Sequence, residues 1–192
     1  MKGFIVVYNK LSNAEMKDLS ALRSDKNKRP LGRGATAKVY SFPKNSSLHS
    51  KYVYRVQKPQ DGFDAYPYLE FAQEVVKSKS RHLPKMKFLA YRKNSYGDIV
   101  EVVNVLERLD NWVYHHEDAD GYWVSDLAIY LRGWEYNGRT LDSVKNKRGF
   151  TNSSLRTLRK FFTKTNTDVN DLHEDNVMSR TDGTIVVTDP VC

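Results

Sequence analysis

The sequence predicts an α+β fold in which a five-stranded antiparallel sheet with one inserted helix precedes a smaller helical region. Three observations support this fold class. Short segments of alternating apolar and polar residues recur between residues 31 and 106. Within that stretch, residues 64–79 carry apolar side chains at helical spacing instead. Two more helical patterns and a short apolar hairpin follow further along the chain.

The N-terminal part of the chain holds a strand and a helix ahead of this sheet. Phe4–Tyr8 is an apolar run typical of a short strand. Ser12 and Glu15 form a capping-box pattern, which predicts a helix to about Arg23. A charged stretch follows, so we assign residues 1–29 to an N-terminal extension outside the sheet. The inward face of the helix would carry Met16, Leu19 and Leu22.

The five strands of the sheet are separated by turn residues and by the inserted helix. Two strands flank a glycine turn within residues 31–42, and the others are expected at residues 51–57, 86–91 and 98–106. The inserted helix would begin at an Asp64 cap, with Pro67 in its first turn, and run to about Lys79.

The remaining elements are helices and one hairpin. Residues 122–134 and 153–162 have helical patterns, and residues 176–189 form two short apolar strands around a turn at Thr181–Gly183. A hairpin leaves and returns to the same end, so it would bring Asn176 and Asp189 close together.

Length and composition describe an ordinary globular protein. The chain has 192 residues, of which 40% are hydrophobic and 28% charged. Its single cysteine, Cys192, excludes a disulfide framework within one chain and suits a reducing cytoplasm. The Phe4–Tyr8 run is too short for a signal peptide core or a membrane span, so we expect a cytoplasmic protein with no membrane partner.

The charge of the chain favours anionic partners. The formal net charge is +8 and the pI is about 9.4, which suits nucleotide phosphates, nucleic acid or acidic protein surfaces. The basic clusters at residues 23–29 and 145–148 are not interleaved with aromatic side chains. We therefore expect no direct binding of nucleic acid.

Two groups of residues point to phosphate chemistry. Gly32 and Gly34 lie in a turn between strands, where the lack of a Cβ lets backbone N–H groups approach a phosphate, although such a turn alone is most often just a hairpin. Asn176 and Asp189 supply two oxygen ligands suited to Mg²⁺, with the Asp171 carboxylate just upstream. Taken singly, each of these three residues is also common in loops.

The spacing of Asp171, Asn176 and Asp189 resembles the catalytic-loop and metal-binding signature of the protein-kinase-like superfamily. The closing residues "DLHEDNVM" and "TDPV" are most similar to the early serine/threonine protein kinases of bacteriophages that infect enterobacteria. The resemblance covers roughly residues 30–192. It implies a minimal bilobal kinase-like fold, with an N-lobe at residues 30–109 and a truncated helical C-lobe at residues 110–192.

The resemblance also implies roles for single residues. Asp171 falls at the catalytic base, and Asn176 and Asp189 fall at the Mg²⁺ ligands. The residues that would contact ATP are Gly32, Gly34 and Val39, together with a hinge near Glu107–Leu109.

One departure concerns the lysine that normally binds the α/β-phosphates, because Arg55 stands in its place. Lys58 is the nearest lysine, but it has the opposite strand parity and should face away from Arg55. The glutamate expected to pair with Arg55 is Glu74, at the more usual interval, or Glu70. The chain also ends at Cys192, so we expect the peptide-binding region of an ordinary kinase to be absent or supplied elsewhere.

The function implied is ATP- and Mg²⁺-dependent phosphorylation of serine or threonine hydroxyls on host proteins in the bacterial cytoplasm during phage infection, altering host machinery such as transcription. One alternative is a small-molecule phosphotransferase of the aminoglycoside or choline kinase type, which the "DLH" segment also resembles. The other is a non-catalytic pseudokinase that binds a host protein, which Arg55 and the early chain end favour.

Overall fold

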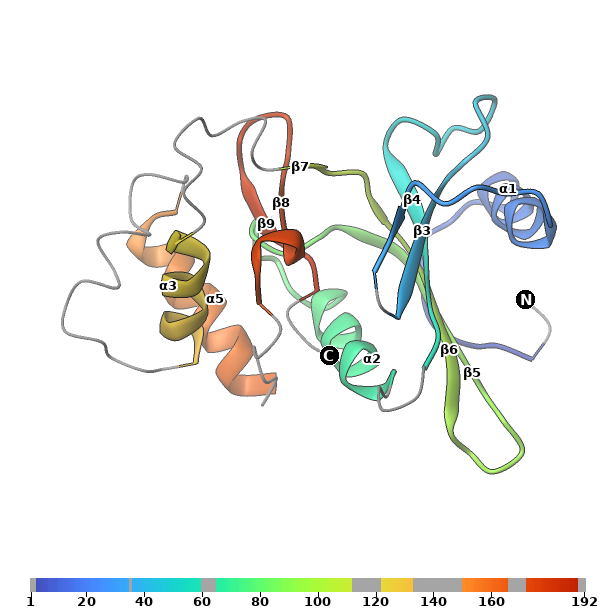
Figure 1. Cartoon of the computed structure of the whole chain (residues 1–192). Coiled ribbons are helices and arrows are strands. Elements are labelled where there is room, and N and C mark those ends of the chain that lie inside the picture. The colour runs from blue at the N-terminus through green and yellow to red at the C-terminus, as the bar shows by residue number, and fades with distance from the viewer. Residues whose placement is uncertain are drawn as a thin grey trace. The chain divides into compact units, whose positions relative to one another are not determined.

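The computed structural model describes residues 3–34, 36–59, 65–111, 122–132, 150–165 and 172–189. The chain divides into two compact units, shown in Figure 1. The first unit comprises Met1–Val76 and Lys85–Arg108, and the second comprises Lys77–Pro84 and Leu109–Cys192. Among the described residues, no helix is both long enough and apolar enough to cross a lipid bilayer.

The first unit is built on an antiparallel sheet of six strands, not the five that the sequence predicted. The additional strand is β1, which pairs with β5 at one edge of the sheet and so draws the expected N-terminal extension into it. The sequence pattern marks β1 as a strand but does not identify its partner, which lies far along the chain. In spatial order the strands are β1 (Ile5–Asn9), β5 (Met86–Lys93), β6 (Ile99–Glu107), β4 (Tyr52–Gln57), β3 (Ala37–Ser41) and β2 (Gly32–Arg33).

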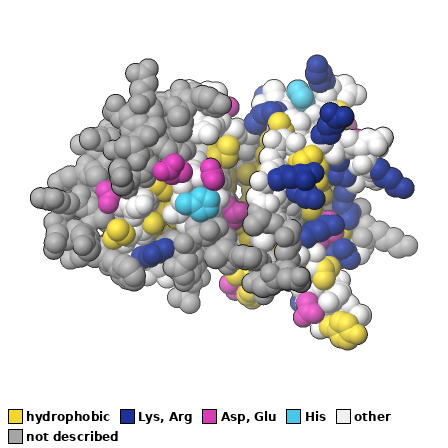
Figure 2. Space-filling view, viewed as in Figure 1, with side chains coloured by type: hydrophobic (Ala, Val, Ile, Leu, Met, Phe, Trp, Pro, Cys, Tyr) yellow, Lys and Arg dark blue, Asp and Glu magenta, His cyan; other side chains and the backbone are white. Residues whose placement is uncertain are grey.

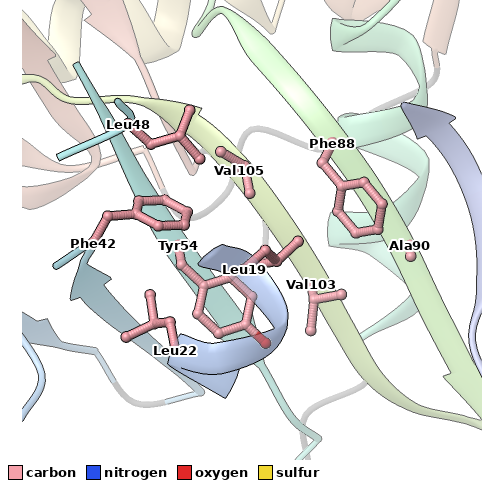
Figure 3. Close-up of a cluster of buried hydrophobic side chains, with 9 residues drawn as sticks. All are labelled: Leu19, Leu22, Phe42, Leu48, Tyr54, Phe88, Ala90, Val103 and Val105. Carbon is pink, nitrogen blue, oxygen red and sulfur yellow. The ribbon is translucent and has the colours of Figure 1, made fainter. Parts of the chain in front are cut away.

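Helix α1 (Asn13–Ser24) covers one face of this sheet. It begins with the predicted capping box: Ser12 Oγ accepts from the Glu15 N–H at 3.3 Å, and Glu15 Oε2 accepts from the Ser12 N–H at 2.8 Å. Leu19 and Leu22 of α1 are buried as predicted, against a core formed by inward residues of three strands, β4, β5 and β6, and of the loop between β3 and β4 (Figure 3). Those core residues are Phe42, Leu48, Tyr54, Phe88, Ala90, Val103 and Val105.

Helix α2 (Tyr66–Val75) lies on the other face of the sheet, with Pro67 in its first turn as predicted. The expected cap, Asp64, lies outside the described residues. The helix ends at Val75, short of the predicted Lys79. Beyond it, Ser80 N–H donates to Ser78 Oγ at 3.1 Å and His82 N–H donates to Ser80 Oγ at 3.2 Å. Such local bonds compete with helix continuation.

The second unit combines helices with a small antiparallel sheet. Among the residues that the structure describes here, the helices are α3 (Tyr122–Leu131), α5 (Asn152–Thr165) and the 3-10 turn η2 (Glu174–Asn176). Its strands, in the order β7-β8-β9, are Asp110–Asn111, Val177–Ser179 and Ile185–Val187. The hairpin of β8 and β9 turns at Gly183, whose φ of 77° belongs to the left-handed region that glycine adopts readily.

Candidate functional site

Strand register in the first unit aligns several of the predicted nucleotide-binding residues. Gly32 of β2 is the cross-strand partner of Val39 of β3, and Val39 is the partner of Arg55 of β4. Direct partners project to the same face of a sheet. Val39 and Arg55 therefore lie side by side, with the Gly32 backbone beside Val39.

Gly32 lies in strand β2 and not in the turn as predicted, whereas Gly34 lies in the turn between β2 and β3. Neither position requires glycine for packing or backbone geometry. A Cβ built at Gly32 or Gly34 meets no atom within 4 Å, and neither residue has a positive φ. The Gly34 N–H donates to the Ala37 carbonyl at 2.9 Å, which closes the turn. Packing and backbone geometry thus do not explain these glycines, whereas close approach of a ligand to the backbone would.

Arg55 is packed into the interior of the first unit, with only 6% of its surface exposed. Its Nη1 donates to Gln57 Oε1 at 2.7 Å, and its guanidinium lies 3.6 Å from the ring centre of Tyr68 on α2. The Tyr68 hydroxyl in turn accepts from Asn104 Nδ2 at 2.5 Å, and Asn104 is the strand partner of Arg55. Arg55 therefore belongs to a buried polar cluster between the sheet and α2.

Lys58 lies on the opposite face of the sheet, as strand parity predicts. The register of β4 with both neighbouring strands is continuous, so no bulge reverses the alternation. Tyr54 and Val56 project to the α1 face, and Lys58 lines the same cavity as those two residues. Lys58 is exposed and does not take the place of Arg55 on the α2 face.

The two candidate partners of Arg55 differ in burial. Glu70 is exposed, whereas Glu74 is half-buried one helical turn further along α2. Glu74 is therefore the one on the packed side of the helix. The sequence placed both residues on one helical face and favoured Glu74 only by its interval from Arg55, and the packing of α2 adds the difference in burial.

The predicted hinge at Glu107–Leu109 coincides with the passage of the chain from the first unit to the second, between Arg108 and Leu109. Glu107 is buried, and its Oε1 accepts from the Lys85 N–H at 2.7 Å while its own N–H donates to the Lys85 carbonyl at 2.8 Å. Its carboxylate therefore pins the start of β5. Leu109 is half-buried.

The hairpin in the second unit places Asn176 and Asp189 at one end. Val177 pairs with Val187, and beyond that pair the Thr188 N–H and Oγ1 both donate to the Asn176 carbonyl, at 2.9 and 3.0 Å. Asp189 follows Thr188 directly, and both Asn176 and Asp189 are half-buried.

His173 is a site neighbour that the sequence analysis left out of its candidate residues. Its Nε2 lies 3.0 Å from Asn176 Nδ2, and its Nδ1 lies 3.3 Å from the Asp175 N–H and 3.9 Å from Asp175 Oδ2. A neutral imidazole has one acceptor nitrogen, so Nδ1 accepts from the Asp175 N–H in one tautomer and Nε2 accepts from Asn176 Nδ2 in the other. In the second tautomer the amide oxygen of Asn176 points away from the imidazole. The three-residue spacing to Asn176 across η2 was the available signal.

The donor chemistry of this end of the hairpin fits a hard divalent cation. An amide oxygen and a carboxylate are ligands that Mg²⁺ accepts, usually together with phosphate oxygens and water. The part of the chain that the structure describes holds no cluster of three or more His, Cys, Asp or Glu side chains arranged for a metal. Asp171, predicted to be the catalytic base, lies outside the described residues and stays a prediction.

Comparisons with known proteins return little at the level of sequence. No protein-family model matches the chain, and no curated protein matches it. Among solved structures it is similar to the apo GRMZM2G135359 pseudokinase, with a TM-score of 0.47 and 11% sequence identity. That match covers 97% of this chain and 64% of the other, so the chain spans less than two thirds of that protein's length.

Proposed function

We propose that this protein has a protein-kinase-like fold and transfers the γ-phosphoryl group of ATP to serine or threonine hydroxyls, with Mg²⁺ as cofactor. The sequence resemblance adds that the substrates are host proteins in the cytoplasm of a phage-infected bacterium. The observation that carries the proposal is the hairpin register, which supports a joint role for Asn176 and Asp189 at one end of β8 and β9.

In this proposal the second unit supplies the metal ligands and the base. The oxygens of Asn176 and Asp189 would hold Mg²⁺, which when bound offsets the charge of the phosphate oxygens. Asp171 would orient the attacking hydroxyl and accept its proton. His173 would fix the amide plane of Asn176 through the contact between Nε2 and Nδ2.

The first unit would supply the nucleotide contacts. The backbone at Gly32 and Gly34 would approach the phosphates, Val39 would cover the adenine, and the chain at Glu107–Leu109 would bind the adenine edge. The order of elements supports this assignment: β2, β3 and β4 precede α2, and β5 and β6 follow it in the same antiparallel sheet.

A second candidate function is a non-catalytic kinase-like protein that binds a host factor. The observation that favours it is the burial of Arg55, which donates to Gln57 and stacks on Tyr68. A guanidinium held in this way is occupied by structural contacts, and its planar fork is not equivalent to a compact lysine ammonium.

Thermal stability with ATP tests the nucleotide site. We expect ATP to raise the melting temperature only when Mg²⁺ is present, because Asn176 and Asp189 bind the metal and not the nucleotide itself. Asp189→Asn should abolish the shift. Asp175→Asn removes an exposed carboxylate next to Asn176 and should leave the shift intact. A shift that Asp189→Asn preserves would contradict the metal assignment.

Transfer of labelled phosphate to proteins of a bacterial lysate then separates the two candidate functions. The first function predicts labelled proteins, with the label lost in Asp171→Asn while the Mg²⁺-dependent ATP shift is kept. The second predicts no label. Label transfer that survives both Asp171→Asn and Asp189→Asn would show that these carboxylates do not form the catalytic site.

A further inference from the structure

A cavity of about 570 Å³ lies in the first unit, on the α1 face of the sheet. Its floor is formed by side chains of β3 and β4, including Tyr40, Tyr54 and Val56, and its walls by the end of α1 and the turn between β2 and β3. The volume falls within the range of small-ligand pockets, which runs from about 300 to 1,000 Å³.

This cavity is distinct from the proposed nucleotide site. Successive residues of a strand project to opposite faces, so Tyr54 and Val56 face the cavity while Arg55 and Gln57 face α2. The sheet itself separates these two sets of side chains. Gly34, in the turn between β2 and β3, is common to the cavity lining and to the proposed nucleotide contacts. The side chains on the α1 face are not part of the proposed nucleotide site, so they need their own explanation.

The lining is strongly cationic. Arg23, Lys28, Lys38 and Lys58 line the cavity, and Glu101 is its one carboxylate among the described residues. Glu101 lies 3.2 Å from Arg92 Nη2, outside the lining, and 4.0 Å from Arg23 Nη2. The negative charge of Glu101 is thus offset largely by Arg92, which does not line the cavity. Figure 2 shows several lysine and arginine side chains on the visible face of the first unit.

Two of the four cations, Lys28 and Arg23, form contacts within the protein. Lys28 Nζ donates to the carbonyls of Arg23 and Asp25 at 2.9 and 2.8 Å, so it covers the carbonyl end of α1. That contact removes a negative dipole end that would repel an anion. Arg23 stacks on Phe4, 4.1 Å from the ring centre, and approaches Glu101.

Lys38 and Lys58 are the cations left to meet a ligand. Both are exposed, and neither forms an ion pair within the described residues. Lys38 is the partner of Val56, and the Lys58 N–H donates to the Thr36 carbonyl at 3.0 Å. The two lysines are therefore diagonal cross-strand neighbours, about 7–8 Å apart at the backbone. Two like charges so placed repel each other unless an anion lies between them.

The geometry points to a binding site for a phosphorylated small molecule of nucleotide size in this cavity, with Lys38 and Lys58 on the phosphate and Tyr40 against the non-polar part. Lysine is a compact charge suited to phosphate oxygens, and a tyrosine ring suits a planar or apolar group. The lining also includes Ser20 and Thr36, whose hydroxyls can add polar contacts, whereas Ser24 Oγ donates to the Ser20 carbonyl at 2.9 Å. This site is independent of the proposed kinase function.

Titration calorimetry with AMP and with inorganic pyrophosphate, without Mg²⁺, tests the site. The double variant Lys38→Glu/Lys58→Glu should weaken binding of both probes at least about tenfold, because it reverses both ligand-facing charges. The matched control, Lys44→Glu/Lys93→Glu, makes the same change in net charge at exposed lysines outside the cavity and should bind like wild type. Tyr40→Ala should weaken AMP binding more than pyrophosphate binding.

Amide chemical-shift changes place the ligand on one face of the sheet. With AMP present, the changes should centre on Lys38, Tyr40 and Lys58. Asp189→Asn should leave them unchanged, so failure of the metal site and failure of this site are distinguishable. Equal binding by the two double variants, or shifts centred on the Arg55 face, would overturn the inference.

Discussion

Arg55 faces the side of the sheet that strand alternation predicts, but it is held there in a buried polar cluster that the sequence does not predict. Strand parity alone predicts that Arg55 and Lys58 face opposite ways, and the structure has that arrangement. The sequence does not predict the cluster around Arg55, because Tyr68 and Asn104 reach it from α2 and β6. Contacts between distant elements follow from packing and leave no local signal.

The stability of the first unit should depend on Arg55. Arg55→Ala leaves Gln57 Oε1 without this donor and removes the stacking on Tyr68, so we expect a loss of about 2–3 kcal/mol in the free energy of unfolding. Urea denaturation measures it. Arg33→Ala, at an exposed arginine of β2, should cost under about 0.5 kcal/mol. Equal effects of the two variants would mean that the Arg55 cluster is not stabilising.

In the candidate site, too, contacts set by local sequence could be predicted and contacts set by the fold could not. The hairpin that brings Asn176 and Asp189 together could be predicted, because its strands, turn and register are local. The contact of His173 with Asn176 could not be ranked above other loop contacts from sequence, since it depends on the fold of η2.

At the scale of elements, local signals were the most informative. The capping box of α1, the strands β3 to β6 and the hairpin all lie where periodicity and turn residues predict them. The pairing of β1 with β5 and the two-residue strand β7 were not predicted. Both arise from partners far apart in sequence, and β7 is too short to show a period.

The capping box should contribute to stability because α1 covers the core of the first unit. Ser12→Ala removes the acceptor for the Glu15 N–H, and we expect a loss of about 1 kcal/mol in the free energy of unfolding. Chemical denaturation checks this value. Ser47→Ala, at an exposed position in a turn, is the control and should have little effect. If Ser12→Ala were as stable as the control, the capping box would not contribute to the free energy of unfolding.

At the scale of the whole molecule, the chain forms two units whose segments alternate in sequence. Residues 77–84 belong to the second unit although they lie between elements of the first. His82 fixes this segment: its ring stacks on Phe150 at 4.3 Å, its Nδ1 bonds to the Ile185 carbonyl at 2.8 Å, and its own carbonyl accepts from the Val187 N–H at 3.0 Å.

The second unit should lose stability in mild acid because of His82. Burial lowers the pKa of His82 to about 4, against the Ile185 hydrogen bond that raises it, and the charges of Arg81 and Arg180 add to the lowering. The unfolded chain, with a pKa of about 6.5, therefore takes up the proton first. The contribution of neutral His82 to the free energy of unfolding is fully present above pH 6.5, and it is lost as the pH falls toward 4. The loss is on the order of 2 kcal/mol between pH 7 and about pH 5.

Unfolding measured at both pH values tests this dependence. His82→Gln cannot titrate and should show a smaller loss between them than wild type. His173→Gln, at an exposed histidine, should lose as much as wild type. If wild type and His82→Gln lost stability equally, the carboxylates and not His82 would be responsible.

The pairing of β1 with β5 also orders events during synthesis. Roughly 80 residues separate the two strands, so at about 5–20 residues per second β1 leaves the ribosome several seconds before its partner. During that interval Ile5, Val6 and Val7 have no β5 to pair with, and these three residues remain 48%, 49% and 38% exposed even in the finished sheet. The apolar segment Ile5–Val7 is therefore exposed in the nascent chain until β5 has been synthesised.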